Sequence, residues 1–283
     1  MEEKEKWSKI TLDFDKEIID QELLMGWLVY YGVESIVEND DNLESYVLTS
    51  DLAAVLDGLK TNQSLSKVKI TTETVEDKNW NEIWESNFEP VKIGDVGIRA
   101  EFHDPMEAKY EIIIQPKMAF GTGHHETTYM MIEYMSQQKL EGLSVLDYGC
   151  GTGILAILAH KLNAKPITAI DMQEEAVENT VEQMMLNDIP PIDIDVEQSD
   201  ISFLDDTEYD VILANINRHV ILGKIEEISK RLKEGGQLLV SGILKSDEKK
   251  VLSLYNSHNF TLKHSNYKGE WCLFVLEKDI IEK

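Results

Sequence analysis

The 283-residue sequence has few cysteines, a small share of basic residues and no long apolar run. Its two cysteines, Cys150 and Cys272, stand at unrelated places, which excludes a disulfide framework and is typical of a reducing compartment. No stretch approaches the ~20 consecutive apolar residues that a bilayer-spanning helix needs. The start, MEEKEKW, lacks the basic residues and apolar centre of a secretory signal. These absences predict a soluble cytoplasmic protein.

Acidic residues dominate the charge: 53 Asp and Glu stand against 27 Lys and Arg, for a formal net charge of −26. Between Pro166 and Asn217 there is no Lys or Arg, against fourteen Asp or Glu. Nucleic-acid binding depends on basic side chains that neutralise phosphates, so this balance argues against RNA or DNA as a direct partner. It fits either general acidic solubility or attraction of a basic protein, and composition leaves both open.

The length favours two domains. Residues 1–75 have the order strand, helix, strand, strand, helix, strand, which predicts a ferredoxin-like α+β domain whose sheet can act as a docking surface. Residues 76–92 carry large aromatic residues four positions apart, which predicts a linker helix with an aromatic packing face.

Residues 93–283 alternate strands with helices, which predicts a doubly wound α/β domain with a mostly parallel sheet. Helices are expected to begin near Ile154, Glu174, His219 and Ser246. The expected strands are VLDYG, ITAID, IDIDVEQ, DVILAN, GQLLVSG, FTLKHS and WCLFVLE.

The most specific motif is VLDYGCGTG at residues 145–153, an apolar strand that leads through three glycines into an apolar helix. Glycines there let a ligand lie against the backbone. A dinucleotide fold would usually have G-x-G-x-x-G, whereas this spacing is G-x-G-x-G with Asp147 just before it. A carboxylate at that place suits a cationic ligand, so Asp147, Gly149 and Gly151 are candidate cofactor residues. A plain tight turn is the alternative.

Asp171 ends the next apolar strand, twenty-two residues after Gly149. A carboxylate at this tip accepts both ribose hydroxyls in nicotinamide enzymes and in S-adenosylmethionine (SAM) enzymes, so it predicts a nucleoside ligand. The glycine spacing then favours SAM. Asp200, after the third strand, either meets the adenine amino group or is a plain loop aspartate.

Asn215 ends the fourth strand, where a doubly wound sheet opens its ligand crevice. Methyl transfer to nitrogen needs a lone pair, and a lysine with a pKa near ~10.4 must first lose a proton at a cost of roughly 4 kcal/mol. A nearby carboxylate would raise that cost, whereas an asparagine oxygen holds an uncharged amine without raising it. Asn215 is therefore the candidate catalytic residue, and a turn-capping asparagine is the alternative.

The loop before the glycine motif, FGTGHHETT at residues 120–128, is flanked by glycines and leads into a helix. Such a loop can close over a cofactor. The adjacent His124 and His125 point in different directions and have no third ligand at useful spacing, so helix capping is favoured and no metal is predicted.

FGTGHHETT, VLDYGCGTG with Asp171, and LANIN, in this order and at these separations, resemble the PrmA family, whose members methylate protein eleven of the large ribosomal subunit. The resemblance covers nearly the whole chain. It implies an N-terminal ferredoxin-like recognition domain, a helical linker with Trp residues and a C-terminal class I SAM-dependent methyltransferase domain. It also implies SAM contacts at Thr128, Gly149, Asp171 and Asn215, with Phe120 and Thr122 as lid residues.

The sequence departs from the common family form at two places, with GTGHHETT where GTGTHPTT is usual and NINRH where NILA is usual. The expected function is SAM-dependent N-methylation of lysine or N-terminal amines of a basic large-subunit ribosomal protein. The enzyme is expected to be monomeric, without membrane or direct nucleic-acid contact. The alternatives are a SAM-dependent methyltransferase acting on RNA or a small molecule, and a non-catalytic binder that senses SAM.

Overall fold

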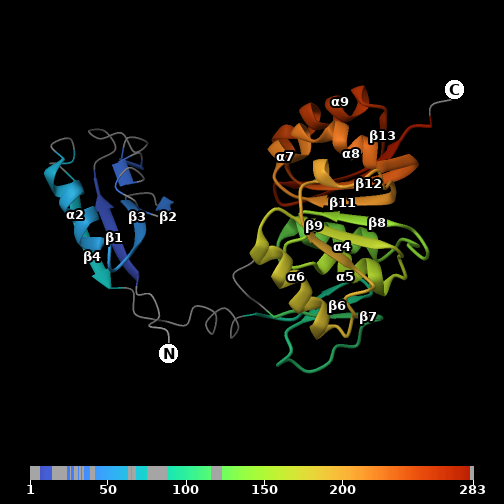
Figure 1. The fold of residues 1–283 in the computed structure, drawn as a ribbon, viewed down its shortest axis with the longest axis horizontal. Helices are drawn as coiled ribbons and strands as arrows, with labels where there is room; N and C mark the ends of the chain where they lie inside the picture. Colours follow the sequence, from blue (N-terminus) through green and yellow to red (C-terminus); the bar gives the residue numbers. More distant parts are fainter. Residues whose placement is uncertain are drawn as a thin grey trace. The chain divides into compact units, whose positions relative to one another are not determined.

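The chain folds into two compact units, Met1–Ile83 and Trp84–Lys283, each with its own hydrophobic core (Figure 1). The computed structural model describes residues 7–14, 24–25, 27–28, 31, 33, 35–38, 42–62, 65, 68–74, 88–115 and 123–280. Within these residues, none of the helices combines the length and hydropathy that a membrane crossing requires.

The smaller unit is a four-stranded antiparallel sheet in the order β2-β3-β1-β4. Its described elements are β1 (Trp7–Asp13), β2 (Ser35–Glu38), β3 (Asn42–Leu48), α2 (Leu52–Thr61) and β4 (Lys69–Thr74). Every second residue of β1 and β3 is buried, which is the pattern of a sheet covered on one face. The helical residues Leu24 and Leu28 join Val55 and Leu59 of α2 in the core on that face. This sheet order is the one expected for the predicted ferredoxin-like domain.

The larger unit is built on a seven-stranded sheet in the order β10-β9-β8-β11-β12-β14-β13. Neighbouring strands from β10 to β12 are parallel, whereas β14 is antiparallel to both β12 and β13. The strands are β8 (Val145–Tyr148), β9 (Ile167–Asp171), β10 (Asp195–Gln198), β11 (Tyr209–Asn215), β12 (Leu232–Leu244), β13 (Phe260–Lys268) and β14 (Trp271–Lys278). All seven coincide with predicted strands.

Helices cover both faces of this sheet. Their bounds are α4 (Glu126–Met135), α5 (Ile154–Lys161), α6 (Glu174–Leu186), α7 (Arg218–Gly223), α8 (Ile225–Arg231) and α9 (Glu248–Ser257), with short 3₁₀ turns η2 (Ile201–Phe203) and η3 (Lys245–Asp247). Figure 1 shows α4, α5 and α6 on one face and α7, α8 and α9 on the other. Successive residues of β11 point to opposite faces: Leu213 joins the core on the α4–α5 side, and Ile212 joins the core on the α7–α9 side. The predicted doubly wound class is confirmed.

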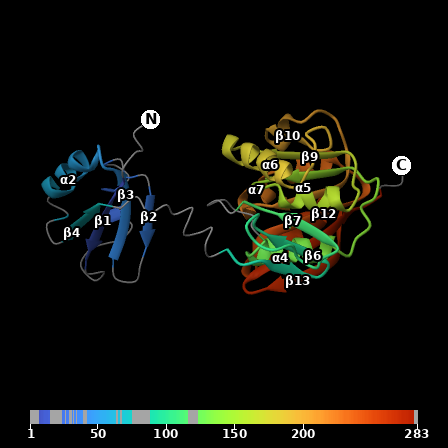
Figure 2. The same cartoon turned by 90° about the horizontal axis from the view of Figure 1, so that it is seen from below.

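A small sheet that the sequence did not predict comes before α4. It consists of β5 (Val91–Ile93), β6 (Val96–Arg99) and β7 (Tyr110–Ile113), and it packs against α4 and α5 (Figures 1 and 2). Strands of three or four residues are too short to show a periodic pattern.

The predicted linker helix is wrong at its carboxyl end. Residues 88–90 are irregular and β5 begins at Val91, before the predicted boundary at residue 93; residues 76–87 lie outside the described residues. Phe88 is buried in the core of the larger unit, where its ring meets those of His103 and His124.

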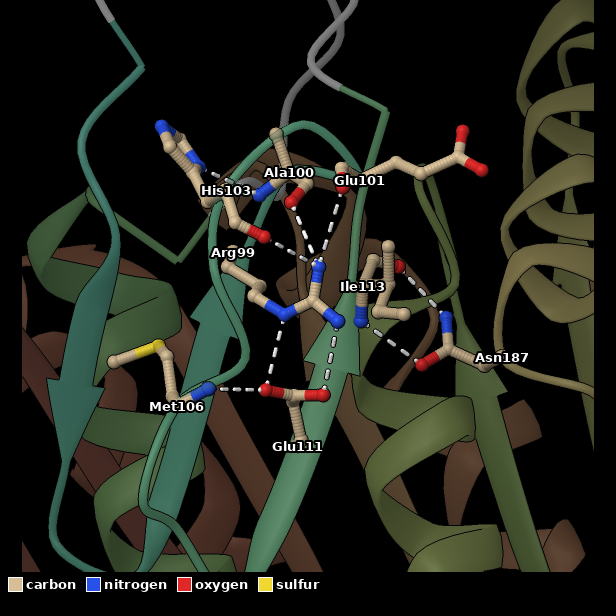
Figure 3. Close-up of polar contacts among 8 residues, drawn as sticks. All are labelled: Arg99, Ala100, Glu101, His103, Met106, Glu111, Ile113 and Asn187. Atoms are coloured by element: carbon tan, nitrogen blue, oxygen red, sulfur yellow. Dashed lines mark hydrogen bonds and ion pairs between the residues drawn. The ribbon is translucent and has the colours of Figure 1, made fainter.

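An ion pair between the buried Arg99 and the partly buried Glu111 fixes the loop between β6 and β7 (Figure 3). The Arg99 guanidinium contacts both oxygens of the Glu111 carboxylate: Nε lies 3.0 Å from Oε1, and Nη2 lies 3.1 Å from Oε2. Arg99 Nη1 also donates to the carbonyls of Ala100 and His103, at 3.1 Å each, while Glu111 accepts the amide of Met106. The hydrogen bonds from Arg99 lower the pKa of Glu111, which burial alone would raise.

Side-chain amides at the carboxyl end of α6 form hydrogen bonds with backbone groups at the end of β7 and just after it. The Asn187 side chain, just after α6, accepts from the Ile113 amide at 2.9 Å and donates to the Ile113 carbonyl at 2.7 Å, as a neighbouring strand would (Figure 3). Gln183 accepts from the Gln115 amide at 2.8 Å. The small sheet is thereby attached to the helix that follows β9.

Replacing Arg99 with methionine is expected to destabilise the larger unit by about 3 kcal/mol, because the partly buried Glu111 would lose its counter-ion and keep only the Met106 amide as a donor. The exposed Lys92, which donates to the Glu107 carbonyl, is the control, and Lys92→Met should change stability by less than about 0.5 kcal/mol. Urea unfolding followed by hydrogen exchange in peptides from residues 88–115 measures both. Equal effects of the two variants would contradict this role of the pair.

Candidate functional site

The register of the sheet gathers three of the predicted site residues at one edge. Tyr148 of β8 pairs with Ile170 of β9 and with Ala214 of β11. The next residue along each of these strands is a predicted one, namely Gly149, Asp171 and Asn215. The chain order also reverses at β8, with β9 on one side and β11 on the other. This edge is the switch point at which open α/β sheets bind ligands.

The turn after β8 requires its glycines. Gly149, Gly151 and Gly153 have φ angles of 77°, 56° and 72°, which side-chain-bearing residues rarely adopt. A Cβ atom on Gly149 would lie 2.1 Å from Cγ2 of Ile216, and one on Gly153 would lie 2.6 Å from Cγ2 of Thr180. The turn is therefore packed closely against the chain that leaves β11 and against α6.

Asp171 binds the glycine turn directly. One carboxylate oxygen accepts from the Gly151 amide and the other from the Gln173 amide, each at 3.1 Å. The side chain is only partly buried, so lone pairs remain for a ligand at the strand tip. The structure thus links two residues that the sequence placed in one cofactor site.

Asp147 lies beneath the turn rather than at its surface. It is 1% exposed, and its Oδ2 accepts from the Ala156 amide at 3.1 Å, in the first turn of α5. Burial, with help from the nearby Asp171 carboxylate, raises the pKa of Asp147 to about 7, although the bond from Ala156 opposes the shift. The direct contact found for this carboxylate is therefore with the helix; its predicted effect on a cationic ligand stays a prediction.

The raised pKa of Asp147 predicts a pH-dependent stability. A carboxyl group whose folded pKa exceeds its unfolded value of ~3.9 contributes its stability below that value and loses it as the pH rises through the folded pKa. Wild type should therefore lose about 2 to 3 kcal/mol relative to Asp147→Asn between pH 5 and pH 8. Urea unfolding of both proteins at the two pH values measures the difference, and parallel pH slopes would refute it.

Asp200 is held by the protein itself. Its carboxylate accepts from Lys224 Nζ at 2.6 Å, from the Tyr148 hydroxyl at 3.1 Å, and from the amide and hydroxyl of Ser202. Burial raises the pKa of Asp200, but the hydrogen bonds from Lys224 and Ser202 outweigh it and lower the pKa to about 2. Of the two alternatives that the sequence left open, this geometry favours the structural aspartate.

The Asn215 side-chain nitrogen has a hydrogen-bond partner, whereas its side-chain oxygen has none among the described residues. Its Nδ2 donates to Thr128 Oγ1 at 3.0 Å, and Thr128 is fully buried on α4. His125 caps that helix by accepting the Thr127 amide, as predicted. The Asn215 Oδ1 atom is buried, and no described group donates to it. A buried acceptor without a donor costs stability, and such a cost is typically retained where a ligand completes the bond.

A cavity of about 530 Å³ opens beside Asn215. Apolar side chains, among them Ile216 and Trp271, form part of its wall. Charged groups are contributed by Arg218 at the start of α7 and by Asp247 at the end of η3. The glycine turn and Asp171 are not among its described lining residues, so Asn215 is the one strand-end residue of the three that the described wall includes.

Two predicted residues, Phe120 and Thr122, lie outside the described residues. The structure adds Trp271, Arg218 and Asp247, which sequence reasoning did not select. Arg218 falls in the unusual NINRH segment, so the departure from the family pattern was a usable signal. Trp271 and Asp247 had no such signal, because only the folded chain brings them to the end of β11.

The donor and acceptor set fits SAM. Asp171 offers carboxylate oxygens where ribose hydroxyls are held in such folds. The glycine turn leaves backbone accessible at the switch point. Asn215 offers a buried acceptor in the wall of the cavity. Together with the strand order, this defines a Rossmann-like SAM-dependent methyltransferase.

The profile of the family described as Ribosomal protein L11 methyltransferase (PrmA) matches residues 5–279, and the chain belongs to this family. A relative from Porphyromonas gingivalis, named ribosomal protein L11 methyltransferase, is 42% identical over 266 residues, 91% of each chain. A relative of the same name from Chlorobaculum tepidum is 33% identical and covers 95% of this chain and 96% of its own. A crystal structure of ribosomal protein L11 methylase from Lactobacillus delbrueckii subsp. bulgaricus has a TM-score of 0.63 and 28% identity, covering 68% of this chain and 100% of its own.

Proposed function

We propose that this enzyme methylates amines of ribosomal protein L11, on lysine side chains, the N-terminus or both. The observation that supports it most is the buried, unpartnered Asn215 Oδ1 at the end of the cavity. The names of the relatives, which all designate ribosomal protein L11 methyltransferases, support the choice of substrate.

Bound SAM would supply a methyl group on a positively charged sulfur. The amine lone pair would form a bond to the methyl carbon, and the C–S bond would break with its electron pair staying on sulfur. Asp171 would hold the ribose hydroxyls, and Gly149 and Gly151 would leave room along the backbone. Thr128 acts through Asn215, since its hydroxyl receives the Asn215 amide and so fixes which way the Oδ1 atom faces.

Asn215 would orient the acceptor. Its Oδ1 would accept one N–H of an uncharged amine and so orient the nitrogen lone pair for attack on the methyl group. An amide oxygen carries no full charge and so does not favour the ammonium form as a carboxylate would. Catalysis then consists of positioning and exclusion of water, with no covalent enzyme intermediate.

The smaller unit would bind the substrate protein. The face of its sheet away from the helices carries Trp7, Tyr46 and Leu48 together with Lys9 and Glu44, all only partly buried. Such a mixed apolar and polar face suits a protein surface. The strong net negative charge of the chain would attract a basic ribosomal protein over longer range.

The test incubates the purified enzyme with SAM and either ribosomal protein L11 or total RNA of its host, and locates added methyl mass by mass spectrometry. Methyl groups on lysine or N-terminal amines of the protein, absent with Asn215→Ala, are expected. Methyl groups on RNA alone, or on neither, would reject the substrate assignment and leave the methyltransferase fold intact.

A further inference from the structure

Arg218 and Asp247 form an ion pair in the wall of the cavity that ends at Asn215. The two residues come from the start of α7 and from η3, twenty-nine positions apart in the chain. Both side chains are mostly buried, at 28% and 19% exposed. The pair therefore lies where solvent screens charges weakly and where an incoming side chain would meet it.

Arg218 also engages the neighbouring histidine. The His219 ring donates from Nδ1 to Asn217 Oδ1, which leaves Nε2 as the acceptor for Arg218 Nη2 at 3.2 Å. The other lining histidine, His125, uses its Nδ1 to accept the Thr127 amide. In each of these two rings, the nitrogen that accepts is thus engaged by a group of the protein.

The Arg and Asp charges of the described lining cancel. Arg218 contributes one positive charge and Asp247 one negative charge, and the two form an ion pair. Around this lining, Lys245 and Glu248 flank Asp247 in the chain, Glu270 precedes Trp271, and Glu126 lies near Gly269. None of these four outer groups lines the described cavity wall.

We propose that Arg218 is a specificity-determining residue: by pairing with Asp247 it neutralises the carboxylate in the described wall of the acceptor cavity, so that the cavity selects the uncharged form of the substrate amine. The inference rests on the proposed amine methylation. Without Arg218, Asp247 would be a lone carboxylate in the cavity and would bind the ammonium form, which has no lone pair to donate. The proton of the ammonium is lost to water before entry.

Removing Arg218 and removing Asp247 are expected to have opposite effects on the pH dependence of kcat. Arg218→Met should move the pH dependence of kcat about one pH unit upward and lower KM, because Asp247 would stabilise the ammonium form. Asp247→Asn should move it about one unit downward and raise KM, because the lone guanidinium would repel a cation. The double variant removes both charges and should return the midpoint to that of wild type, as should Arg218→Lys.

The experiment measures methyl transfer to ribosomal protein L11 between pH 6 and pH 10 for all five proteins. Arg231→Met is the matched control, because Arg231 pairs with Asp206 before β11, at the opposite end of that strand; it should leave the midpoint unchanged. The proposal would be overturned if the variants lost rate at every pH without a shift of the midpoint. It would also be overturned if both single variants shifted the midpoint in the same direction.

A separate binding arm keeps this result distinct from the substrate assignment. n-Butylamine is titrated against the intrinsic fluorescence of wild type and of the Arg218→Met and Asp247→Asn variants, with Trp271→Phe showing which part of the signal comes from the cavity. Tighter binding of the amine at pH 7 by Arg218→Met than by wild type supports charge selection even if L11 is not methylated. Equal binding by all three proteins contradicts it even if L11 is methylated.

Discussion

Asn215→Ala is expected to lower kcat by about 100- to 1,000-fold, the usual cost of removing one positioned polar group from an active site. The affinity for SAM should change by less than about threefold, since the proposed ribose contact at Asp171 and the proposed backbone contacts of the glycine turn would be kept. The Thr128 hydroxyl would lose its partner but would stay on a helix whose packing is unchanged. Single-turnover rates and calorimetric SAM titration separate the two effects.

Asn256, an exposed residue of α9, provides the control for Asn215. Asn256→Ala should leave both kcat and SAM affinity as in wild type. If Asn215→Ala instead reduced SAM affinity as strongly as kcat, Asn215 would be a cofactor residue only, and another group would have to hold the amine.

Asp171→Ala is expected to weaken SAM binding by about 100-fold, because two hydrogen bonds to a charged acceptor are worth about 3 kcal/mol together. The variant also deprives the amides of Gly151 and Gln173 of their acceptor, so the glycine turn itself should loosen. Asp171→Asn keeps one oxygen for these contacts and should lose only about tenfold. Calorimetric titration with SAM measures all three proteins.

The matched control for Asp171 is Asp195, an exposed aspartate of β10 in the same acidic stretch of sequence. Asp195→Ala changes the net charge equally and should not alter SAM binding. Comparable weakening by both variants would show that overall charge, rather than a ribose contact, sets the affinity.

The strand-tip residues could be predicted from the sequence because each stands at the end of a short apolar run. In a parallel sheet the ends of such runs meet at one edge, so the positions of Gly149, Asp171 and Asn215 followed once the strands had been recognised. The five inner strands were visible for the same reason, since buried strands of a doubly wound sheet are nearly continuous apolar segments. The edge strands β10 and β13 are mostly exposed and carry polar residues.

The far wall of the cavity could not be predicted in this way. Arg218, Asp247 and Trp271 belong to a helix start, a 3₁₀ turn and a strand start, and no period or spacing relates them. The role of Asp147 was equally hidden, because its position suggests a ligand contact while its side chain turns under the loop to α5. Such details depend on side-chain packing and not on the strand pattern.

The order of the sheet also determines when this protein can become active during its own synthesis. β8 pairs with β11, more than sixty residues later, and β11 in turn pairs with β12, so the strand that bears Asn215 is flanked on both sides only after Ser241 has been made. Pairing of such distant segments is slow relative to local helix formation. A nascent chain that already carries the whole smaller unit and the glycine turn therefore still lacks the neighbour that flanks Asn215, and the described cavity wall is complete only after Trp271 has been made.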